Sequence, residues 1–135
     1  MITVRSAQAT DAATIARHEE ASVLEASSYR GRPDPVAGAI ASLVAVLDGV
    51  VVGSLTYTVD GISWIVVRCY VETEFRGVGA GDALVGHFLS AAHASGATRV
   101  GGSALPGDRA TKNLFERNGL VARLILVERD LDPGQ

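Results

Sequence analysis

The chain has very little of what disulfide-rich, zinc-binding and nucleic-acid-binding proteins are built from. Its 135 residues include a single cysteine, Cys69, so it can form no internal disulfide and has no spacing typical of a zinc site. Twelve basic residues stand against fifteen acidic ones, and no basic run or aromatic-interleaved basic patch occurs. We therefore expect neither a bound metal nor a nucleic acid partner.

Long apolar runs are also missing. No stretch could span a bilayer, and the first residues, Met1 to Arg5, lack the apolar centre of a signal peptide. We therefore expect a cytosolic protein without a membrane partner. What the chain does have is 47% apolar and 20% charged residues, which is typical of a globular fold. Its length predicts a single domain over residues 1–135 with a core of its own.

The middle of the chain carries the clearest secondary-structure pattern. Three β-rich runs, residues 42–47, 50–59 and 62–71, are separated by the pairs Asp48-Gly49 and Asp60-Gly61. Asp-Gly between two apolar runs indicates a hairpin, because both residues tolerate the positive φ of the turn. The sequence therefore predicts a three-stranded antiparallel meander.

Helical and strand patterns alternate on both sides of this meander. The predicted elements are a strand at 2–5, a helix from Thr10 or Asp11 to about 21, a helix at 79–94, a strand at 99–104, a helix at 109–118 and a strand region at about 120–131. The strand at 99–104 follows a helical crossover, so we expect it to be parallel to its neighbour. This order predicts an α/β (α+β) fold with a mixed, mostly antiparallel central sheet flanked by helices.

A glycine-rich segment, Arg76-Gly77-Val78-Gly79-Ala80-Gly81, joins the third strand of the meander to a helix. Such a turn leaves backbone N–H groups unpaired at the positive end of the helix dipole, and glycines let a bulky anion reach them. We expect a phosphorylated ligand here. A Rossmann dinucleotide site would need a third glycine three residues after Gly81, where Leu84 stands, and an initial βαβ unit in place of hairpins.

These residues match a known family. The chain resembles the GNAT superfamily of acyl-CoA-dependent N-acetyltransferases over nearly its whole length. Arg76, Gly79 and Gly81 satisfy the family signature of Gln or Arg, two residues, Gly, one residue, and Gly or Ala. The segment from Asp108 to Leu120 is similar to a second family region, a helix that ends in an aromatic residue and a Glu-Arg-x-Gly-like stop. The resemblance implies the GNAT fold and direct transfer of the acetyl group of acetyl-CoA to a primary amine of a small molecule or peptide.

The resemblance also implies where acetyl-CoA lies. The pantetheine arm would pair like an additional strand with Cys69, Tyr70 and Val71, in a gap between this strand and residues 99–104. The pyrophosphate would lie on the backbone amides of Gly77, Val78, Gly79, Ala80, Gly81 and Asp82. Arg76 would contact a phosphate or orient the loop. The acceptor would approach between residues 25–32 and the central strands.

The catalytic groups are less evident. Phe115 stands where the family often has a tyrosine that protonates the departing thiolate, so water, Tyr70 or Ser103 would have to take this role. The base that accepts the proton of the acceptor ammonium is expected to be a carboxylate or a water relay, and Glu72 and Glu74 lie just beyond the third strand of the meander. The alternative is a catalytically weak or inactive acyl-CoA-binding protein with a regulatory or structural role. His18, His87 and His93 show no ligand or triad spacing, and we assign them no role.

The C-terminal region lacks a turn. Residues 120–127 read Leu-Val-Ala-Arg-Leu-Ile-Leu-Val, where family members usually have two strands joined by a loop. Either one long strand closes the sheet or the edge of the sheet stays open. An open apolar edge tends to find a partner, so we expect a homodimer as one possible assembly.

Overall fold

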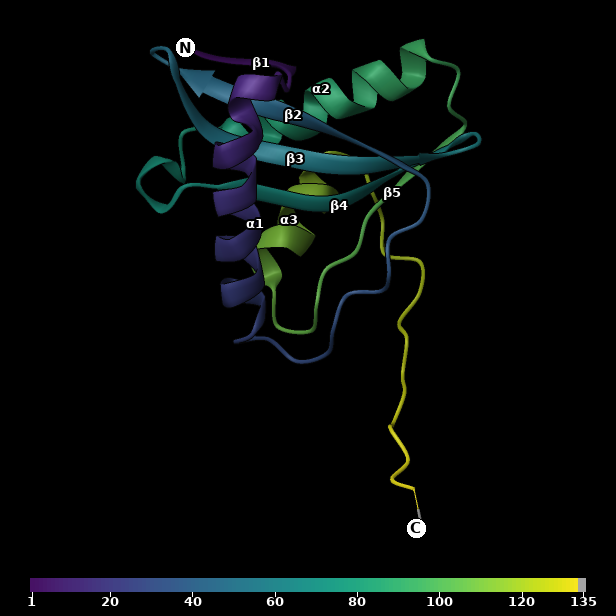
Figure 1. Cartoon of the computed structure of the whole chain (residues 1–135). Helices are drawn as coiled ribbons and strands as arrows, with labels where there is room; N and C mark the ends of the chain where they lie inside the picture. Colours follow the sequence, from purple (N-terminus) through teal and green to yellow (C-terminus); the bar gives the residue numbers. More distant parts are fainter. Residues whose placement is uncertain (134–135) are drawn as a thin grey trace.

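The protein is built around a five-stranded mixed sheet in the order β1-β2-β3-β4-β5 (Figure 1). The computed structural model describes residues 1–133. Neighbouring strands from β1 to β4 are antiparallel, and β5 is parallel to β4. The strands are β1 (Ile2–Ser6), β2 (Ala39–Leu47), β3 (Val50–Asp60), β4 (Ser63–Val71) and β5 (Arg99–Gly101), and the helices are α1 (Ala12–Ala26), α2 (Ala80–Ala94) and α3 (Arg109–Arg117), with 3-10 turns η1 (Ala9–Asp11) and η2 (Thr73–Phe75). This architecture confirms the predicted fold class.

Both predicted hairpins are present, with different turns. Asp48 and Gly49 have φ values of 50° and 77°, the pair of positive angles that a type I′ turn requires. In the second hairpin only Gly61 has positive φ, 59°, and it occupies the first of two loop positions because Asp60 still pairs with Ser63. That arrangement is typical of a type II′ turn.

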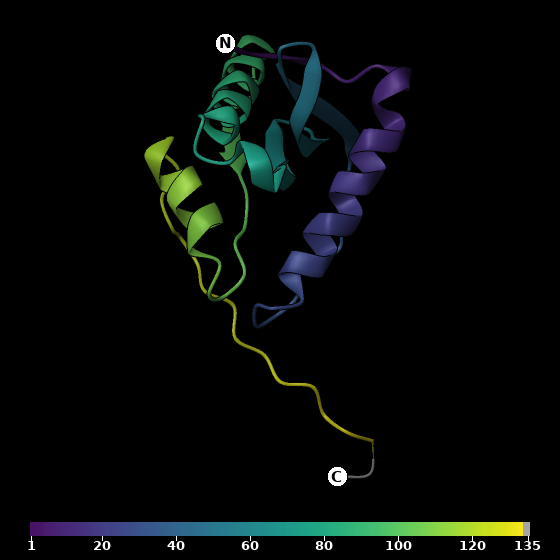
Figure 2. The same cartoon turned by 90° about the vertical axis from the view of Figure 1, so that its left-hand side faces the viewer.

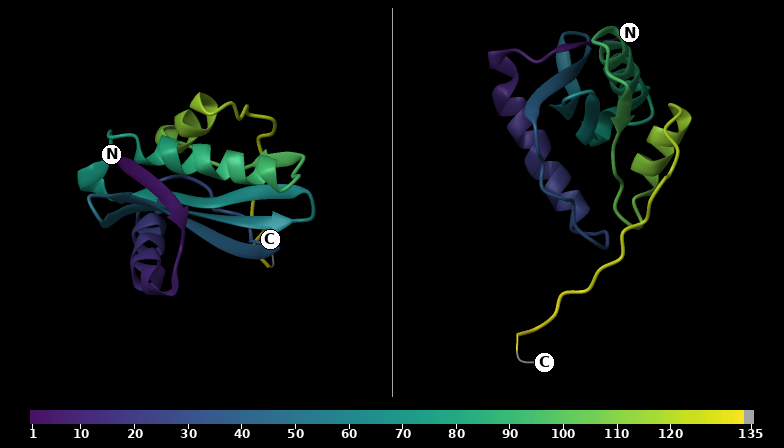
Figure 3. Two further views of the ribbon diagram at one scale, coloured as in Figure 1. Left: turned by 90° about the horizontal axis from the view of Figure 1, so that it is seen from above. Right: turned by 90° about the vertical axis from the view of Figure 1, so that its right-hand side faces the viewer.

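The helices divide between the two faces of the sheet. In Figure 2 and Figure 3, α1 lies on one face, whereas α2 and α3 lie on the other. The hydrophobic core lies on the α2 face, because α2 buries Leu84, Val85 and Phe88 completely against Leu55 and its neighbours. Burial of such side chains contributes roughly 1.5–3 kcal/mol each. Apolar burial on the α2 face of the sheet therefore stabilises the fold.

The α1 face is unusually polar. The only fully buried side chain of α1 is His18, and the strand residues buried on the same face include Ser54, Thr56 and Thr58. A buried polar group needs a hydrogen-bond partner to offset its desolvation. Ser42 and Thr56 satisfy each other across two strands at 2.9 Å. The α2 face of the sheet is thus apolar and stabilises the fold, whereas the α1 face is rich in polar, hydrogen-bonding side chains.

A β-bulge in β4 decides which of its side chains lie on which face. Thr56 pairs with Arg68 and the next residue of β3, Tyr57, pairs with Val66, so Val67 is left without a partner. Before the bulge the even-numbered Trp64 and Val66 pack into the core. After it the odd-numbered residues Cys69 and Val71 do so, and the even-numbered ones turn to the α1 face.

Two sequence predictions about the end of the sheet need correction. The predicted strand at 99–104 ends at Gly101, and residues 102–104 are irregular. The predicted strand region at 120–131 is wrong: residues 118–132 form neither strand nor helix, and the segment runs away from the sheet (Figure 1). A strand needs a neighbour for its backbone groups, and within this chain the segment does not reach β5.

Within residues 1–133 there is no helix both long and apolar enough to cross a membrane. The cytosolic location and the extent of the domain, residues 1–135, stay predictions.

Candidate functional site

The candidate site begins where β4 and β5 part. Their parallel pairing consists of Ser63 with Arg99, Trp64 with Val100 and Ile65 with Gly101, and it ends there. Beyond Ile65, β4 continues to Val71 with β3 as its neighbour on one side only. Within residues 1–133 no strand pairs with its other side, to which an extended chain or ligand arm can add, although the Val71 carbonyl there accepts a hydrogen bond from the Arg76 side chain. This is the divergence that the predicted pantetheine gap requires.

The glycine turn follows the free end of this edge. Gly77 and Gly79 have φ values of 87° and 92°, which side chains with a Cβ rarely adopt, and a Cβ on either would meet no atom within 4 Å. In the described part of the chain, no acceptor takes a hydrogen bond from the backbone N–H groups of residues 77–82. Six consecutive backbone N–H groups at the start of α2 therefore have no acceptor among the described residues, and the space beside Gly77 and Gly79 is open, an arrangement suited to an anion. A Cβ on Gly81, in contrast, would face Leu114 of α3 at 3.5 Å.

Two charged side chains, Arg76 and Asp82, hold the glycine turn in place. The Arg76 guanidinium donates to the carbonyl oxygen of Val71 at 2.8 Å and to Glu25 of α1 at 2.6 Å. Its Cζ also lies 5.3 Å from the centre of the Tyr70 ring. Asp82 accepts from Arg117 and Asn118 at the end of α3. Both contacts tie the turn to neighbouring helices, so of the two roles considered for Arg76 the geometry favours orientation of the loop.

Loops from the two faces of the sheet meet beside this edge. The backbone N–H of Arg30, after α1, donates to the carbonyl oxygen of Pro106 at 3.4 Å, and Gly107 lies against Tyr29. The loop after α1 and the loop after β5 are therefore in contact (Figure 2). The predicted acceptor region, residues 25–32, thus borders residues that follow the diverging strand.

A buried histidine links α1 to the end of β4. His18 is 2% exposed; its Nδ1 lies 2.7 Å from the Ser54 hydroxyl and its Nε2 lies 3.2 Å from Oε1 of Glu72. The Nη2 of Arg17 lies 3.4 Å from the same carboxylate oxygen, and the His18 and Tyr70 rings are 5.1 Å apart. The bulge brings Tyr70 onto this face, so Glu72 and Tyr70 belong to one cluster.

The hydrogen bonds of His18 define its tautomer. A carboxylate only accepts hydrogen bonds, so Nε2 carries the proton and donates to Glu72, while Nδ1 accepts from the Ser54 hydroxyl. Burial lowers the pKa of His18 below its ordinary value of 6.5, and the hydrogen bond with Glu72 offsets only part of this effect. His18 is therefore neutral at pH 7 and holds Glu72 in place.

This pKa shift predicts that stability falls on acidification. Below pH 6.5 the unfolded chain protonates His18 while the folded chain resists, so the free energy of unfolding of the wild type should decrease from about pH 7 to pH 5. His18→Gln should cost about 1–3 kcal/mol at pH 7.5 through the lost buried hydrogen bonds, and it should flatten this pH dependence. Urea unfolding at several pH values measures both effects. His87→Gln, at an exposed position, is the control; an identical slope in wild type and His18→Gln would refute the assignment.

The other predicted site residues differ in their setting. Ser103 is exposed and lies beyond the end of β5, outside any strand. Cys69 packs against the core, and burial together with the Asp82 charge raises the pKa of its thiol to about 12. A neutral thiol is a poor nucleophile. Phe115 is buried, and its ring lies so close to Gly102 that a Cβ there would approach it to 2.7 Å.

Sequence reasoning missed His18 and Ser54. Glu72 was found because it adjoins the strand that ends in the glycine turn. The partners of His18 lie 36 and 54 residues away along the chain, so no local spacing reveals them. The one available signal was the position of His18 three residues after Ile15, on the side of α1 that faces the sheet.

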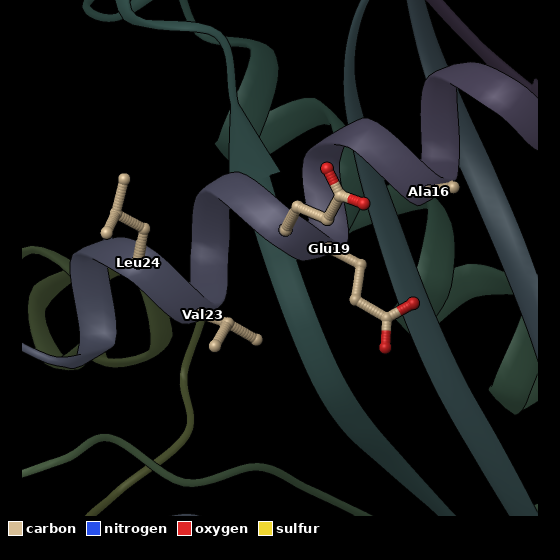
Figure 4. A pocket seen from close by; sticks show the side chains of 5 residues that line it. Ala16, Glu19, Val23 and Leu24 are labelled. Carbon is tan, nitrogen blue, oxygen red and sulfur yellow. The ribbon is translucent and has the colours of Figure 1, made fainter.

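One surface hollow lies along α1. An open depression of about 540 Å³ is bounded only by α1 residues. Figure 4 shows Ala16, Glu19, Val23 and Leu24 of α1 around it. Within residues 1–133, no group of three or more His, Cys, Asp or Glu side chains could hold a metal ion.

Comparison with known proteins identifies the family of this chain. The model of the acetyltransferase (GNAT) family matches residues 8–120. This chain belongs to the GNAT acetyltransferase family. A search of curated protein sequences gives no match for this GNAT protein.

Solved structures resemble this GNAT protein along nearly its whole length. The ribosomal-protein-alanine N-acetyltransferase of Brucella melitensis biovar Abortus 2308 has a TM-score of 0.72 at 17% identity, with 96% of this chain and 99% of that chain covered. A transcriptional regulator from Bacillus halodurans C-125 has a TM-score of 0.75 at 18% identity, with 97% of this chain and 100% of that chain covered. AAC(6′)-Iy in complex with the bisubstrate analog CoA-S-monomethyl-acetylneamine has a TM-score of 0.66 at 16% identity, with 97% of this chain and 99% of that chain covered. At these identities the likeness establishes the fold alone.

Acetyl-CoA, the cosubstrate of the GNAT family, is compatible with the residues present. The free edge of β4 offers backbone groups to an amide-bearing arm, and the free amides of residues 77–82 offer donors to a pyrophosphate. The space over Gly77 and Gly79 leaves room for the phosphates. In this GNAT protein the Glu72 cluster lies at the junction of these two parts.

Proposed function

We propose that this protein is an N-acetyltransferase that moves the acetyl group of acetyl-CoA directly to a primary amine of a small molecule or peptide. The observation that carries the proposal is the unpaired edge of β4, which ends in the free amides of residues 77–82. Cys69, Tyr70 and Val71 would align the pantetheine arm, and Gly77 to Asp82 would hold the pyrophosphate. Acetyl-CoA supplies an activated acetyl thioester.

We assign the general base to Glu72. The carboxylate would take a proton from the acceptor ammonium, and the freed amine would then attack the acetyl carbonyl carbon. The nitrogen then releases its second proton to water, the C–S bond breaks, and the sulfur takes a proton from Tyr70 or water, because Phe115 has none to give. Backbone amides near Val71 would polarise the carbonyl. His18 supports this role, because its Nε2 fixes the carboxylate at 3.2 Å. Ser103 has less support, since it is exposed and no hydrogen bond orients it among the described residues.

A thiol-release assay tests the proposal. Acetyl-CoA is incubated with the protein and a panel of primary amines, and free CoA thiol is measured together with acetylated product. Stoichiometric release of thiol and product with at least one amine is the expected result. Saturable CoA binding without thiol release from any amine would favour the acyl-CoA-binding alternative. Absence of any thermal shift with millimolar CoA would refute both, because a ligand at 100 times its dissociation constant stabilises a fold by about 2.7 kcal/mol.

We also propose that the C-terminal segment, residues 121–131, mediates a homodimer. Its apolar side chains are strongly exposed, with Ile125 at 85% and Val127 at 90%. Arg32 forms an ion pair with Glu128 of this segment at 2.9 Å. Strand β5 has β4 as its one neighbour, so its outer edge is free to accept a strand from a second copy.

Removal of this segment should change the oligomeric state. The full chain should be a dimer and a chain ending at Leu120 a monomer in analytical ultracentrifugation at about 10–100 μM, a range chosen because protomer concentration governs assembly. Leu120 is retained because it packs against the core. Ile125→Lys in the full chain should also give a monomer, since a charged side chain resists burial in an interface. A monomeric full chain over the same concentrations would overturn the dimer proposal.

A further inference from the structure

Arg68 stands apart from the other arginines of the chain. Its side chain is 15% exposed, whereas the next most buried arginine in an ion pair, Arg5, is 39% exposed. Its hydrogen bonding within residues 1–133 consists of a long contact from Nη2 to the Thr56 hydroxyl at 3.4 Å, and its buried Nε has no partner. The nearest carboxylate is Glu19, 3.9 Å from Nη1. A largely buried guanidinium is therefore left nearly unpaired.

Such an arrangement is costly unless an anion completes it. A guanidinium carries five donors, and the loss of solvation on burial is repaid only by close, well-aligned partners. The same face of the sheet shows what a structural arginine looks like here. Arg5 holds the buried Asp11 through its two terminal guanidinium nitrogens, Nη1 and Nη2, at 2.7 and 3.2 Å. The contrast indicates that Arg68 is not satisfied by the chain alone.

The position of Arg68 places it on the proposed acceptor side. The bulge at Val67 turns Arg68 onto the α1 face, where it pairs across the sheet with Thr56, which in turn contacts Ser42. Tyr70 lies two residues further along β4 on the same face, about 7 Å away at the rise of a strand. An amine close to the proposed acyl site could therefore carry a second group that reaches Arg68.

The surroundings select the charge and shape of that group. Glu19 is 59% exposed, so its side chain can turn into solvent and leave the guanidinium to another carboxylate. The fork of a guanidinium matches the two oxygens of a carboxylate. Glu19 and Glu20 line the adjoining surface of α1, and their charge disfavours a dianion and favours an ammonium. A molecule with one carboxylate and one amine fits both conditions.

We propose that Arg68 binds a carboxylate of the acceptor, so that the preferred acceptors are amines with a nearby carboxylate, such as free amino acids or short peptides. The proposal rests on the proposed acetyltransferase function and narrows its substrate class. Arg68 acts as a binding residue for the acceptor, distinct from the groups that move protons.

Matched pairs of acceptors provide the test. L-Lysine is compared with cadaverine, and L-phenylalanine with phenethylamine, since each pair differs by one carboxylate. In the wild type, kcat/KM should be about 10- to 100-fold higher for the carboxylated member, the range expected for a hydrogen-bonded charge pair. Arg68→Gln should bring this ratio close to one by raising KM for the carboxylated amine only. Arg68→Lys should retain part of the preference.

Two further variants separate binding from folding. Glu19→Gln removes the competing carboxylate at an exposed position, so it should lower KM for the carboxylated amines by a few-fold. Arg109→Gln, at an exposed position on α3, should change kcat/KM for neither member of a pair. Saturable CoA binding by each variant shows that the fold is intact, and if Arg68→Gln does not fold, Glu19→Gln and Arg68→Lys carry the test.

The outcomes distinguish the two proposals. Equal use of both members of each pair by the wild type, or an equal loss for both in Arg68→Gln, would overturn the carboxylate site and leave acetyl transfer standing. If no amine releases thiol, acetyl transfer fails. The carboxylate site is then judged by thermal shift with CoA present. A shift with L-lysine that exceeds the shift with cadaverine and vanishes in Arg68→Gln supports it, and no such difference overturns it.

Discussion

Gly79→Val is expected to weaken coenzyme A binding by about 100-fold or more. The added side chain would occupy the open space above the turn, and its Cβ disfavours the φ of 92° that aims the amides of residues 77–82 outward. Hydrogen bonds to a charged group are worth about 1.5–3 kcal/mol each, so the loss of two accounts for a change of this size. Isothermal titration with CoA measures the affinity directly.

The control for Gly79→Val is a variant that introduces the same backbone strain away from the glycine turn. Gly96, at the other end of α2, has φ of 86° and also has no atom within 4 Å of an added Cβ. Gly96→Val should therefore cost a comparable 1–3 kcal/mol of folding free energy and leave the CoA affinity unchanged. If both variants bind CoA as the wild type does, the phosphates do not lie on this turn.

Glu72→Gln is expected to lower kcat by about 10²- to 10⁴-fold, the usual contribution of a general base. The amide keeps the shape of the side chain and can still contact His18, so the fold and the affinity for CoA should change little. KM for the amine should also change little, because the loss falls on proton transfer. Steady-state kinetics from pH 6 to 9 with the best acceptor measures the effect.

Glu74→Gln is the matched control. Glu74 lies two residues further along η2, is exposed, and forms no ion pair with the described residues. Its replacement removes the same charge from the same region and should leave kcat within about twofold, as expected for a surface substitution. A similar kcat in both variants would assign the base to water or to another group.

His18 and Glu72 form one hydrogen-bonded unit. His18 donates to Glu72 and accepts from Ser54, so the orientation of the carboxylate depends on a side chain of α1 and a side chain of β3. Sequence alone indicated Glu72 by its place after the strand. It gave no sign that a histidine 54 residues earlier holds it, since hydrogen bonds between distant segments leave no spacing to read.

Local chemistry accounts for the parts of the fold that the sequence predicted well. The Asp-Gly pairs place hairpins because few other residues accept positive φ. Asp108, a residue type that favours the N-cap position, caps α3 and accepts hydrogen bonds from the backbone and hydroxyl of Thr111. The glycine turn leaves amides free because a helix start has no internal partners for them. Each of these features depends on residues only a few positions apart.

The final segment shows the opposite case. Residues 120–127 have a strong strand pattern, yet they form no strand, because a strand exists only where a neighbour pairs with it. Likewise, the alternation of residues along β4 does not predict which face of the sheet each side chain occupies. Regular alternation would place Trp64, Val66, Arg68 and Tyr70 on one side.

The sequence by itself therefore determined the hairpins, the N-cap of α3 and the free amides of the glycine turn, because short-range backbone geometry fixes them. Only the tertiary structure decided that Val67 bulges, that Arg68 and Tyr70 lie on the α1 face, and that His18 orients Glu72. The physical reason is that pairing between β3 and β4 and packing of α1 on the sheet join residues tens of positions apart. The glycine turn is the proposed site for the coenzyme, and those long-range contacts supply the groups proposed to act on the acceptor.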